Sequence, residues 1–433
     1  MATTYLQNTR GTPTNAQKYT YSFWIKRCEL SDGSKEAFLL DGYADASNRS
    51  KIAFQSGDQL EIWNTHGGSN TFALNPTRKF RDVASWYHIV LSVDTTQSTD
   101  SDRVKLYVNG VQETSLGSTT YPSQNDANNT INESGTTLSI MAYGGNASSD
   151  SYRLSSLMTH IHFTDGYAYP ASTFGETDST SGIWKPKTAP SVTYGNNGFF
   201  LKFENAGNLD LDSSGNNLTF TTSGSLTQNV DTPTNVFATG NPLNPDGTSV
   251  ATLINGNLTH TNNVSATGTF AVDKGKWYFE VKRQDNGGSI TNWMYCGYRP
   301  IDRYVGTSRL YRSSNGDYYN GSSYVSYGAS WGDGDIIGVA LDYDNDKIEF
   351  YKNGVSQGAK TSIGLCDGTL VTPQWQCSQS SGSPHFHANF GSGFFGTSAV
   401  ASANADAYGF GAFEYTVPSG YYALCTKNIK EFG

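Results

Sequence analysis

The sequence is poor in charged residues and has no cluster of basic ones. Lysine, arginine, aspartate and glutamate together make up 15% of the chain, and the formal net charge is −9. Binding to the phosphate backbone of nucleic acid requires a basic face. The composition therefore argues against nucleic acid as a partner, and an acidic polar surface mainly promotes solubility.

Long apolar runs are also missing. No segment approaches the ~20 apolar residues that a membrane-spanning helix needs, and the N-terminal sequence MATTYLQNTRGTPTN contains no apolar signal core. We therefore expect a protein without membrane insertion that is made in a cytosol.

Cysteine is scarce and irregularly spaced. The chain has 5 cysteines, with no CxxC pair and no zinc-like spacing. They are Cys28, Cys296, Cys366, Cys377 and Cys425. Free cysteine packs as a small apolar residue, and thiols stay reduced in a cytosol, so we expect buried thiols rather than disulfides.

Signals for helices are nearly absent, since no amphipathic stretch with caps is present. Instead, short apolar or alternating runs recur between turns rich in glycine and asparagine, in a chain with 46 glycines and 27 tyrosines. Such runs are typical of an all-β protein.

The segment 331–354 has the pattern of an antiparallel hairpin. Ile336 to Leu341 is apolar throughout, which suits a strand buried on both faces. Asp344-Asn345-Asp346 supplies residues that tolerate left-handed backbone. The return strand, 347–351, alternates between polar and apolar residues, and Asn353-Gly354 ends it.

The segment 86–111 repeats this order in the first half of the chain. The apolar strand Ile89 to Val93 ends in Asp94, a polar turn follows, and an alternating strand stops at Asn109-Gly110. Two similar units far apart in one chain imply two sandwiches rather than one large domain.

The two hairpins carry resemblances to known folds. The second resembles the core hairpin of SPRY domains, which bind partners and perform no chemistry. The first half, which begins with an alternating strand at Tyr19 to Arg27, resembles the laminin-G-like, concanavalin-type jelly roll. The resemblances imply an all-β protein of two antiparallel jelly-roll β-sandwiches, one concanavalin A-like (laminin-G-like) and one SPRY-like, joined by an irregular connector.

The domain boundaries follow from turn-rich segments. We place the laminin-G-like sandwich at residues 1–175 and a connector with short strands at 176–245. The SPRY-like sandwich takes 246–396, and a C-terminal segment follows at 397–433.

Several other segments carry a more specific resemblance. They are the opening YLQNTRGTPTNAQKYTYSFWIKR and the segments 163–187, 194–217, 231–245 and 418–429. These segments resemble recurring parts of tail-fibre and other virion proteins of tailed phages, marine ones especially. The resemblance implies a phage structural protein and leaves its position on the particle open.

The sequence shows no catalytic arrangement. Retaining glycoside hydrolysis needs two carboxylates about 5 Å apart, and on a concanavalin-type fold they belong to a Glu-x-Asp-x-x-Glu strand. Glu29, Asp32 and Glu36 come nearest, but the SDGS between them is typical of a turn. Neither a GxSxG nucleophile elbow nor a phosphate loop with its lysine is present. We expect no enzymatic activity.

Two histidine pairs have the spacing of neighbours on one strand face. They are His160 with His162, and His385 with His387. Two imidazoles could bind zinc, but the pattern links no third ligand to either pair. A structural interpretation is favoured.

Three aspartates crowd the turn of the first hairpin. Asp94, Asp100 and Asp102 offer the oxygen ligands that Ca²⁺ prefers, and laminin-G-like domains often hold a calcium ion at the sandwich rim. The alternative is an ordinary acidic turn, because a calcium site needs about six ligands and three can be named. No cofactor is required, and Ca²⁺ is the one candidate ion, in the N-terminal domain.

Aromatic residues concentrate in the span 293–331, and their surface members are candidates for ligand binding. We select Tyr318, Tyr319, Tyr324 and Tyr327. Tyrosine is amphipathic and stiff, which suits contacts with sugars and proteins, and 316–321 is predicted to be a loop tip. The alternative is that these tyrosines are ordinary strand residues.

A second candidate loop lies in the first half, at 63–70. Its binding residues would be Trp63, Asn64 and His66. The alternative is a plain hairpin turn, which the two glycines at 67 and 68 favour.

We therefore expect a non-enzymatic virion protein, a tail fibre or surface appendage, that is assembled in the host cytoplasm and attaches to a host-surface glycan or protein. Its partners would include other virion proteins and further copies of the chain. Trimers are usual in fibres, although no heptad stalk or β-helix repeat is present. The alternatives are a head or tail decoration or joint that contacts only virion proteins, and a polysaccharide depolymerase.

Overall fold

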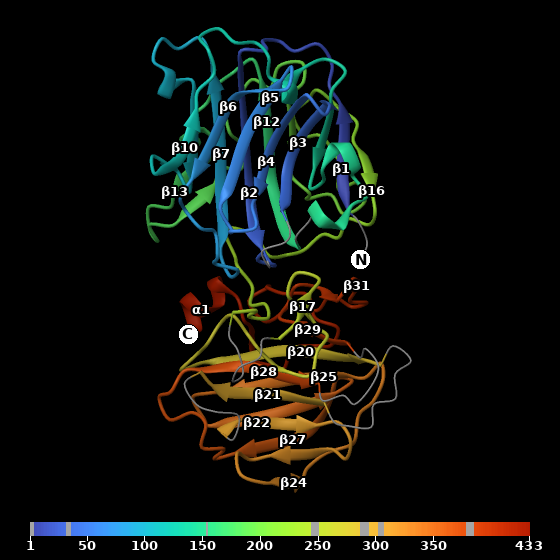
Figure 1. Cartoon of the computed structure of the whole chain (residues 1–433). Helices are drawn as coiled ribbons and strands as arrows, with labels where there is room; N and C mark the ends of the chain where they lie inside the picture. The colour runs from blue at the N-terminus through green and yellow to red at the C-terminus, as the bar shows by residue number, and fades with distance from the viewer. Residues whose placement is uncertain are drawn as a thin grey trace. The chain divides into compact units, whose positions relative to one another are not determined.

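The chain folds into two units, Met1–Gln228 and Asn229–Gly433, each built from β-sheets (Figure 1). The computed structural model describes residues 4–31, 36–152, 155–243, 251–285, 294–301, 307–377 and 385–433. The predicted all-β class with two β-sandwiches is confirmed. The segment expected to be a connector, 176–245, is divided between the units at Gln228.

The first unit packs a larger sheet against a smaller one. The larger has the strand order β10-β6-β5-β4-β3-β11-β1-β16 and the smaller β15-β12-β2-β7-β8-β9. The larger sheet's strands are β1 Tyr5–Thr9, β3 Ala37–Asp45, β4 Asn48–Phe54, β5 Leu60–His66, β6 Ser69–Pro76, β10 Leu116–Thr120, β11 Thr137–Ile140 and β16 Thr221–Ser223. The smaller sheet's strands are β2 Lys18–Arg27, β7 Trp86–Asp94, β8 Val104–Val108, β9 Val111–Gln112, β12 Ser156–Asp165 and β15 Phe199–Leu201.

The predicted hairpin of the first unit is formed by β7 and β8. Val93 lies opposite Val104 and Leu91 opposite Leu106, and all four side chains belong to the core between the sheets. Asn109 and Gly110 then take positive φ angles of 49° and 82°, the left-handed backbone that asparagine and glycine tolerate in tight turns.

The outer face of the smaller sheet is covered by the chain that follows β12. Here β13 Gly175–Thr177 pairs with β14 Trp184–Pro186, and Phe174 packs with Val90 in a small apolar cluster. The Trp184 indole donates a hydrogen bond to Nδ1 of His88 at 2.9 Å. Because this covering layer is apolar, the central strands of the smaller sheet are buried on both faces.

The second unit has the same plan. Its sheets have the orders β17-β18-β29-β20-β25-β26-β27, with β32 beside β20, and β19-β28-β21-β22-β23-β24. The first contains β17 Leu253–Ile254, β18 Thr259–His260, β20 Lys276–Gln284, β25 Ile336–Asp342, β26 Lys347–Lys352, β27 Val355–Thr361, β29 His385–Asn389 and β32 Tyr422–Ala423. The second contains β19 Ser265–Thr267, β21 Met294–Pro300, β22 Arg309–Arg312, β23 Asp317–Tyr319, β24 Tyr324–Ser326 and β28 Val371–Cys377.

The predicted hairpin 331–354 is confirmed by β25 and β26. Every residue of β25 is buried, with Ile337, Val339 and Leu341 in the core between the sheets. Ala340 faces the other way, into a cluster with Phe413 of the C-terminal segment. The strand is apolar on both faces because that segment, like the layer over the first unit, covers the sheet.

Short elements complete the chain. Helix α1 is Thr426–Phe432, β30 Phe394–Phe395 pairs with β31 Ser398–Ala399, and short 3-10 turns are η1 Asp100–Asp102, η2 Thr130–Asn132, η3 Gly144–Asn146, η4 Asp150–Tyr152 and η5 Ala171–Thr173. None of the helices in the described ranges is long and apolar enough to cross a membrane. Cys28, Cys296, Cys366 and Cys425 are free thiols, and all but Cys366 are buried.

Candidate functional site

A tyrosine-rich face lies at the free edge of the smaller sheet in the second unit, where β24 is the last strand. Tyr324 is 42% exposed, and its ring lies 5.0 Å from the ring of Tyr319, its cross-strand partner. The Tyr324 hydroxyl donates a hydrogen bond to the Tyr295 hydroxyl at 3.0 Å. The guanidinium carbon of Arg312 lies 4.9 Å from the centre of the Tyr324 ring. We call these four residues the tyrosine face.

The strand register explains why these residues meet. Tyr295 in β21 lies opposite Arg312 in β22, and Tyr319 in β23 lies opposite Tyr324 in β24. Cross-strand partners share one face of a sheet. Tyr295 and Arg312 were not among the predicted binding residues, because RLYR has no regular alternation of polar and apolar residues that would assign Arg312 to a face.

The tyrosine face combines aromatic rings with the guanidinium of Arg312. Burial, followed by the hydrogen bond with Tyr324, raises the pKa of Tyr295 above its ordinary value. The Tyr295 phenol therefore remains protonated and accepts the hydrogen bond that positions Tyr324, while the exposed ring of Tyr324 can pack against a ligand. Such a surface can contact a sugar ring or a protein side chain.

Two of the four predicted tyrosines do not belong to this face. Tyr318 is buried in the core of the sandwich, because it alternates with Tyr319 in β23 and so points inward. Tyr327 packs against the same core, and its hydroxyl bonds to the Gly358 carbonyl and accepts from the Phe350 N–H. Half of the expected loop tip 316–321 is strand, because β23 covers Asp317–Tyr319. Trp293 and Tyr304 of the aromatic span lie outside the described residues.

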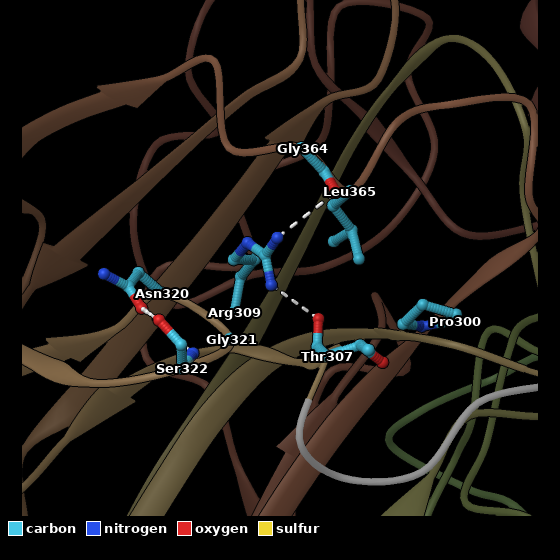
Figure 2. Close-up of a pocket in the computed structure, with 8 residues that line it drawn as sticks. All are labelled: Pro300, Thr307, Arg309, Asn320, Gly321, Ser322, Gly364 and Leu365. Atoms are coloured by element: carbon cyan, nitrogen blue, oxygen red, sulfur yellow. Dashed lines mark hydrogen bonds between the residues drawn. The ribbon is translucent and has the colours of Figure 1, made fainter.

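A pocket of about 210 Å³ borders the turn between β23 and β24 (Figure 2). The guanidinium of Arg309 lies in it and donates hydrogen bonds to the carbonyls of Ile363 at 2.6 Å, Thr307 at 2.6 Å and Gly364 at 3.2 Å. Asn320 accepts from the hydroxyl of Ser322 at 2.9 Å. Most of these hydrogen bonds go from Arg309 to backbone carbonyls of neighbouring segments. Arg309 therefore stabilises the loops around the pocket and has a structural role.

The predicted loop 63–70 is mostly strand. Trp63, Asn64 and His66 belong to β5, and a two-residue turn at Gly67 and Gly68, with φ angles of 58° and 78°, connects it to β6. The hairpin-turn alternative therefore describes this segment better than a binding loop.

Asn64 is wholly buried and cannot contact a ligand at the surface. Its Oδ1 accepts from the Ser50 hydroxyl at 2.6 Å and the Thr130 N–H at 3.0 Å. Its Nδ2 donates to the Thr71 hydroxyl at 2.6 Å and the Asn128 carbonyl at 2.7 Å. Asn64 therefore joins three segments of the first unit from inside.

Trp63 is half-buried under cationic side chains. The Arg49 guanidinium carbon lies 4.9 Å and the Lys51 Nζ 5.7 Å from the centre of the Trp63 ring. Lys51 also pairs with Glu36 at 2.8 Å and with Glu61. These contacts occupy a face of the indole that a ligand would otherwise use.

The three aspartates predicted to bind calcium have separate partners. Asp94 pairs with Lys18 at 3.2 Å, and Asp102 pairs with Lys105 at 3.0 Å. Asp100 accepts through Oδ1 from the Ser101 N–H at 2.7 Å. In the described ranges, no three His, Cys, Asp or Glu side chains come together in a group that could hold a metal ion. The carboxylates, as arranged, do not fit a Ca²⁺ site.

The histidine pairs are held by neighbouring side chains. The His162 ring stacks at 3.8 Å on that of Phe200, and Nδ1 lies 2.9 Å from the Tyr194 hydroxyl. His387 has Thr259 and Gln284 each at 2.8 Å. These contacts agree with a structural interpretation of both histidines.

The acidic residues weighed for glycoside hydrolysis have separate partners. Glu29 accepts from the Ser155 N–H at 3.0 Å, whereas Glu36 pairs with Lys51. Asp32 lies outside the described residues.

Comparisons with known proteins identify a family for part of each unit. Residues 1–146 match the concanavalin A-like lectin/glucanases superfamily (Laminin_G_3), and residues 276–379 match the SPRY domain. The E3 ubiquitin-protein ligase RKP of Arabidopsis thaliana is 33% identical over 104 residues, which are 22% of this chain and 8% of that ligase. The chain thus matches only a small part of this relative.

Parts of the chain also match solved structures at low identity. The SPRY domain of human HERC1 is 20% identical with a TM-score of 0.29, covering 34% of this chain and 96% of that domain. A heptameric SAP-like pentraxin from Limulus polyphemus is 13% identical with a TM-score of 0.31, covering 52% of this chain and 90% of the pentraxin chain. By its family matches, this chain combines an N-terminal concanavalin A-like, laminin-G-like domain with a C-terminal SPRY domain.

Proposed function

We propose that this protein is a non-enzymatic virion component of a tailed phage, a tail fibre or surface appendage that attaches the particle to a host-surface glycan or protein. The observation that carries the attachment role is the tyrosine face, in which exposed Tyr324 lies on the last strand of a sheet and its partners lie on the three strands beside it. Laminin-G-like and SPRY domains are in general protein- or carbohydrate-binding folds.

The virion setting is supported by the sequence resemblance of the opening segment and of 163–187, 194–217, 231–245 and 418–429 to phage structural proteins. Attachment would use weak contacts of single chains, multiplied by the many copies on one particle. Its partners are other virion proteins and further copies of this chain, with the host-surface molecule as the ligand.

Binding to host cells tests the attachment role. The full-length protein, displayed in many copies on a bead, should bind cells of the phage's host, and Tyr324→Ala should weaken binding about tenfold, which corresponds to ~1.4 kcal/mol. Tyr408→Ala is the matched control, because Tyr408 is 53% exposed in the same unit and lies outside the tyrosine face. Equal binding by the Tyr324 variant and the wild type would show that the face is not the contact.

Two further measurements separate the alternatives. Mass spectrometry of purified particles should find the chain, and its absence would contradict the virion setting. Binding to particles without binding to cells would favour a joint or decoration protein. Release of new reducing ends from host polysaccharide would instead establish a depolymerase.

A further inference from the structure

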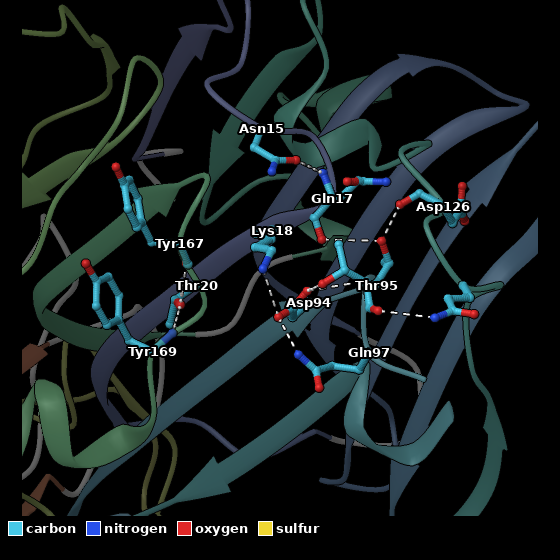
Figure 3. Close-up of polar contacts among 12 residues, drawn as sticks. Asn15, Gln17, Lys18, Thr20, Asp94, Thr95, Gln97, Asp126, Tyr167 and Tyr169 are labelled. Atoms are coloured by element: carbon cyan, nitrogen blue, oxygen red, sulfur yellow. Dashed lines mark hydrogen bonds and ion pairs between the residues drawn. The ribbon is translucent and has the colours of Figure 1, made fainter. Parts of the chain in front are cut away.

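The first unit contains a second aromatic surface, at the end of its smaller sheet. A pocket of about 410 Å³ lies there, between the start of β2, the end of β7 and the loop that follows β12. Asn15, Lys18, Asp94 and the loop 166–169 line it (Figure 3). Its volume is within the range of small-molecule sites.

Two parallel tyrosine rings form one side of this pocket. The rings of Tyr167 and Tyr169 lie 6.1 Å apart with planes only 16° from parallel, and their hydroxyls point the same way (Figure 3). Tyr167 is 38% exposed, and its hydroxyl has no hydrogen-bond partner among the residues that the structure describes. A flat, exposed ring with a free hydroxyl is suited to a ligand that is apolar on its face and polar at its edge.

The loop that presents these rings is held in place before any ligand arrives. The Tyr167 carbonyl accepts hydrogen bonds from the hydroxyls of Thr20 at 3.0 Å and Thr164 at 2.9 Å. The Tyr169 N–H donates to the Thr20 hydroxyl at 2.8 Å, and the Tyr169 hydroxyl accepts from the Thr193 N–H at 3.0 Å. Binding to such a loop costs little ordering entropy.

The polar groups of the pocket offer donors rather than acceptors. Asp94 is occupied: Oδ1 accepts from the N–H and hydroxyl of Thr96, and Oδ2 accepts from Gln97 and pairs with Lys18. The Lys18 ammonium has three N–H groups and is partly exposed, so it retains donors for a ligand. Asn15 accepts from the Gln17 N–H through Oδ1, while its Nδ2 has no partner within the described ranges.

The charge of the pocket is balanced. Burial opposes ionisation of Asp94, but hydrogen bonds from Thr96, Gln97 and Lys18 outweigh it and lower the pKa of the carboxyl below its ordinary value. Asp94 is therefore ionised and compensates Lys18, and the whole chain has a net charge of −9. The pocket therefore offers an anionic ligand no net electrostatic attraction. An uncharged ligand with many oxygen acceptors can still accept hydrogen bonds from the free donors.

We propose that this pocket is a binding subsite for an uncharged sugar. The apolar face of a pyranose ring packs on Tyr167, and its hydroxyl oxygens accept hydrogen bonds from Lys18 Nζ and Asn15 Nδ2. The inference rests on the proposed attachment function in that it names a ligand class for it, but it places that ligand in the laminin-G-like unit and involves no residue of the tyrosine face.

Saturation-transfer NMR with the full-length protein tests the subsite. The probes are neutral oligosaccharides from a glucan, a mannan and a galactan, with alginate oligosaccharides as the acidic comparison. At least one neutral set should bind, with transfer to its ring C–H groups. Tyr167→Ala should weaken binding at least about tenfold and Asn15→Ala a few-fold, while Tyr408→Ala binds as the wild type does.

Three results would overturn the subsite: no neutral probe binds at millimolar concentration, alginate binds in preference, or Tyr167→Ala binds as tightly as the wild type. Melting temperatures of the variants are compared first, since both substituted side chains are at the surface and should leave folding unchanged. Host-cell binding is measured on the same variants. Sugar binding without cell binding refutes the attachment function alone, and cell binding without sugar binding refutes the subsite alone.

Discussion

Glu280 is a buried acid whose ionisation should set the pH dependence of the SPRY unit. It lies in β20 and is fully buried. Its Oε1 accepts from the Tyr278 hydroxyl at 3.1 Å and the Tyr415 N–H at 2.9 Å, and its Oε2 accepts from the Glu414 N–H at 2.9 Å. Glu280 thus ties the C-terminal segment to the sheet that this segment covers.

Burial raises the pKa of Glu280 from 4.5 to about 7, although the hydrogen bonds from Tyr415 and Glu414 oppose the rise. Between these values the folded state holds a proton that the unfolded state has lost. Stability from this group is therefore fully present below pH 4.5 and is lost as the pH rises through 7. At 1.36 kcal/mol for each pKa unit, the loss amounts to about 3 kcal/mol.

The substitution Glu280→Gln isolates this term, because glutamine does not titrate. Its amide nitrogen cannot accept from the Glu414 N–H, which costs stability by the same amount at every pH. The free energy of unfolding of the variant, relative to the wild type, should therefore rise by about 3 kcal/mol between pH 4.5 and pH 8.

Hydrogen exchange in urea, followed by mass spectrometry, measures the free energy of unfolding from peptides of the second unit alone. A measurement of this kind is needed because a chain with two units need not unfold in one step. Glu431→Gln, at an exposed position of α1, is the control and should follow the wild type. A constant difference between the Glu280 variant and the wild type from pH 4.5 to pH 8 would contradict the raised pKa of Glu280.

Three other predictions concern the first unit. Asn64→Ala leaves Ser50, Thr71 and the Thr130 N–H without their partner and should lower the free energy of unfolding in urea by about 3 kcal/mol. The control Asn70→Ala, at an exposed position, should change it little, and equal stability of the two variants would contradict the role of Asn64. Burial lowers the pKa of His160 to about 4, so stability present above pH 6.5 is lost as the pH falls toward 4; unchanged exchange protection of β12 at pH 4 would refute this. Millimolar Ca²⁺ or EDTA should leave the melting temperature unchanged, and a rise with Ca²⁺ would restore the calcium hypothesis.

The strands and their turns could be predicted because their signals are local. An apolar run between turn residues predicts β25 whatever covers it, and the positive φ angles of Asn109 and Asn353 follow from residue type. What covers β25 could not be predicted, because the Phe413 segment lies far away in the sequence and has no regular pattern.

The binding residues were harder to predict, because the alternation of side chains along a strand does not show which face of the strand points into the core. Tyr318 and Tyr319 are adjacent and chemically identical, yet register with β22 places one in the core and the other on the surface. Asparagine is common in loops, so the sequence around Asn64 suggests an exposed position. Asn64 is buried because its hydrogen-bond partners come from segments that are distant in the sequence. Asp94, Asp100 and Asp102 are close in the sequence, but Asp94 pairs with Lys18 and Asp102 pairs with Lys105, so these two carboxylates have separate partners.

The two covering segments explain where a ligand can bind. In the first unit the chain after β12 buries the outer face over Val90, and in the second the segment around Phe413 buries the outer face over Ala340. Central strands covered on both sides offer no surface to a partner. Contacts must then come from surfaces that these segments leave uncovered, such as the edge strand that carries Tyr324 and the loop that carries Tyr167. Substitutions there should change binding without changing stability, whereas substitutions at Val90 or Ala340 should do the reverse.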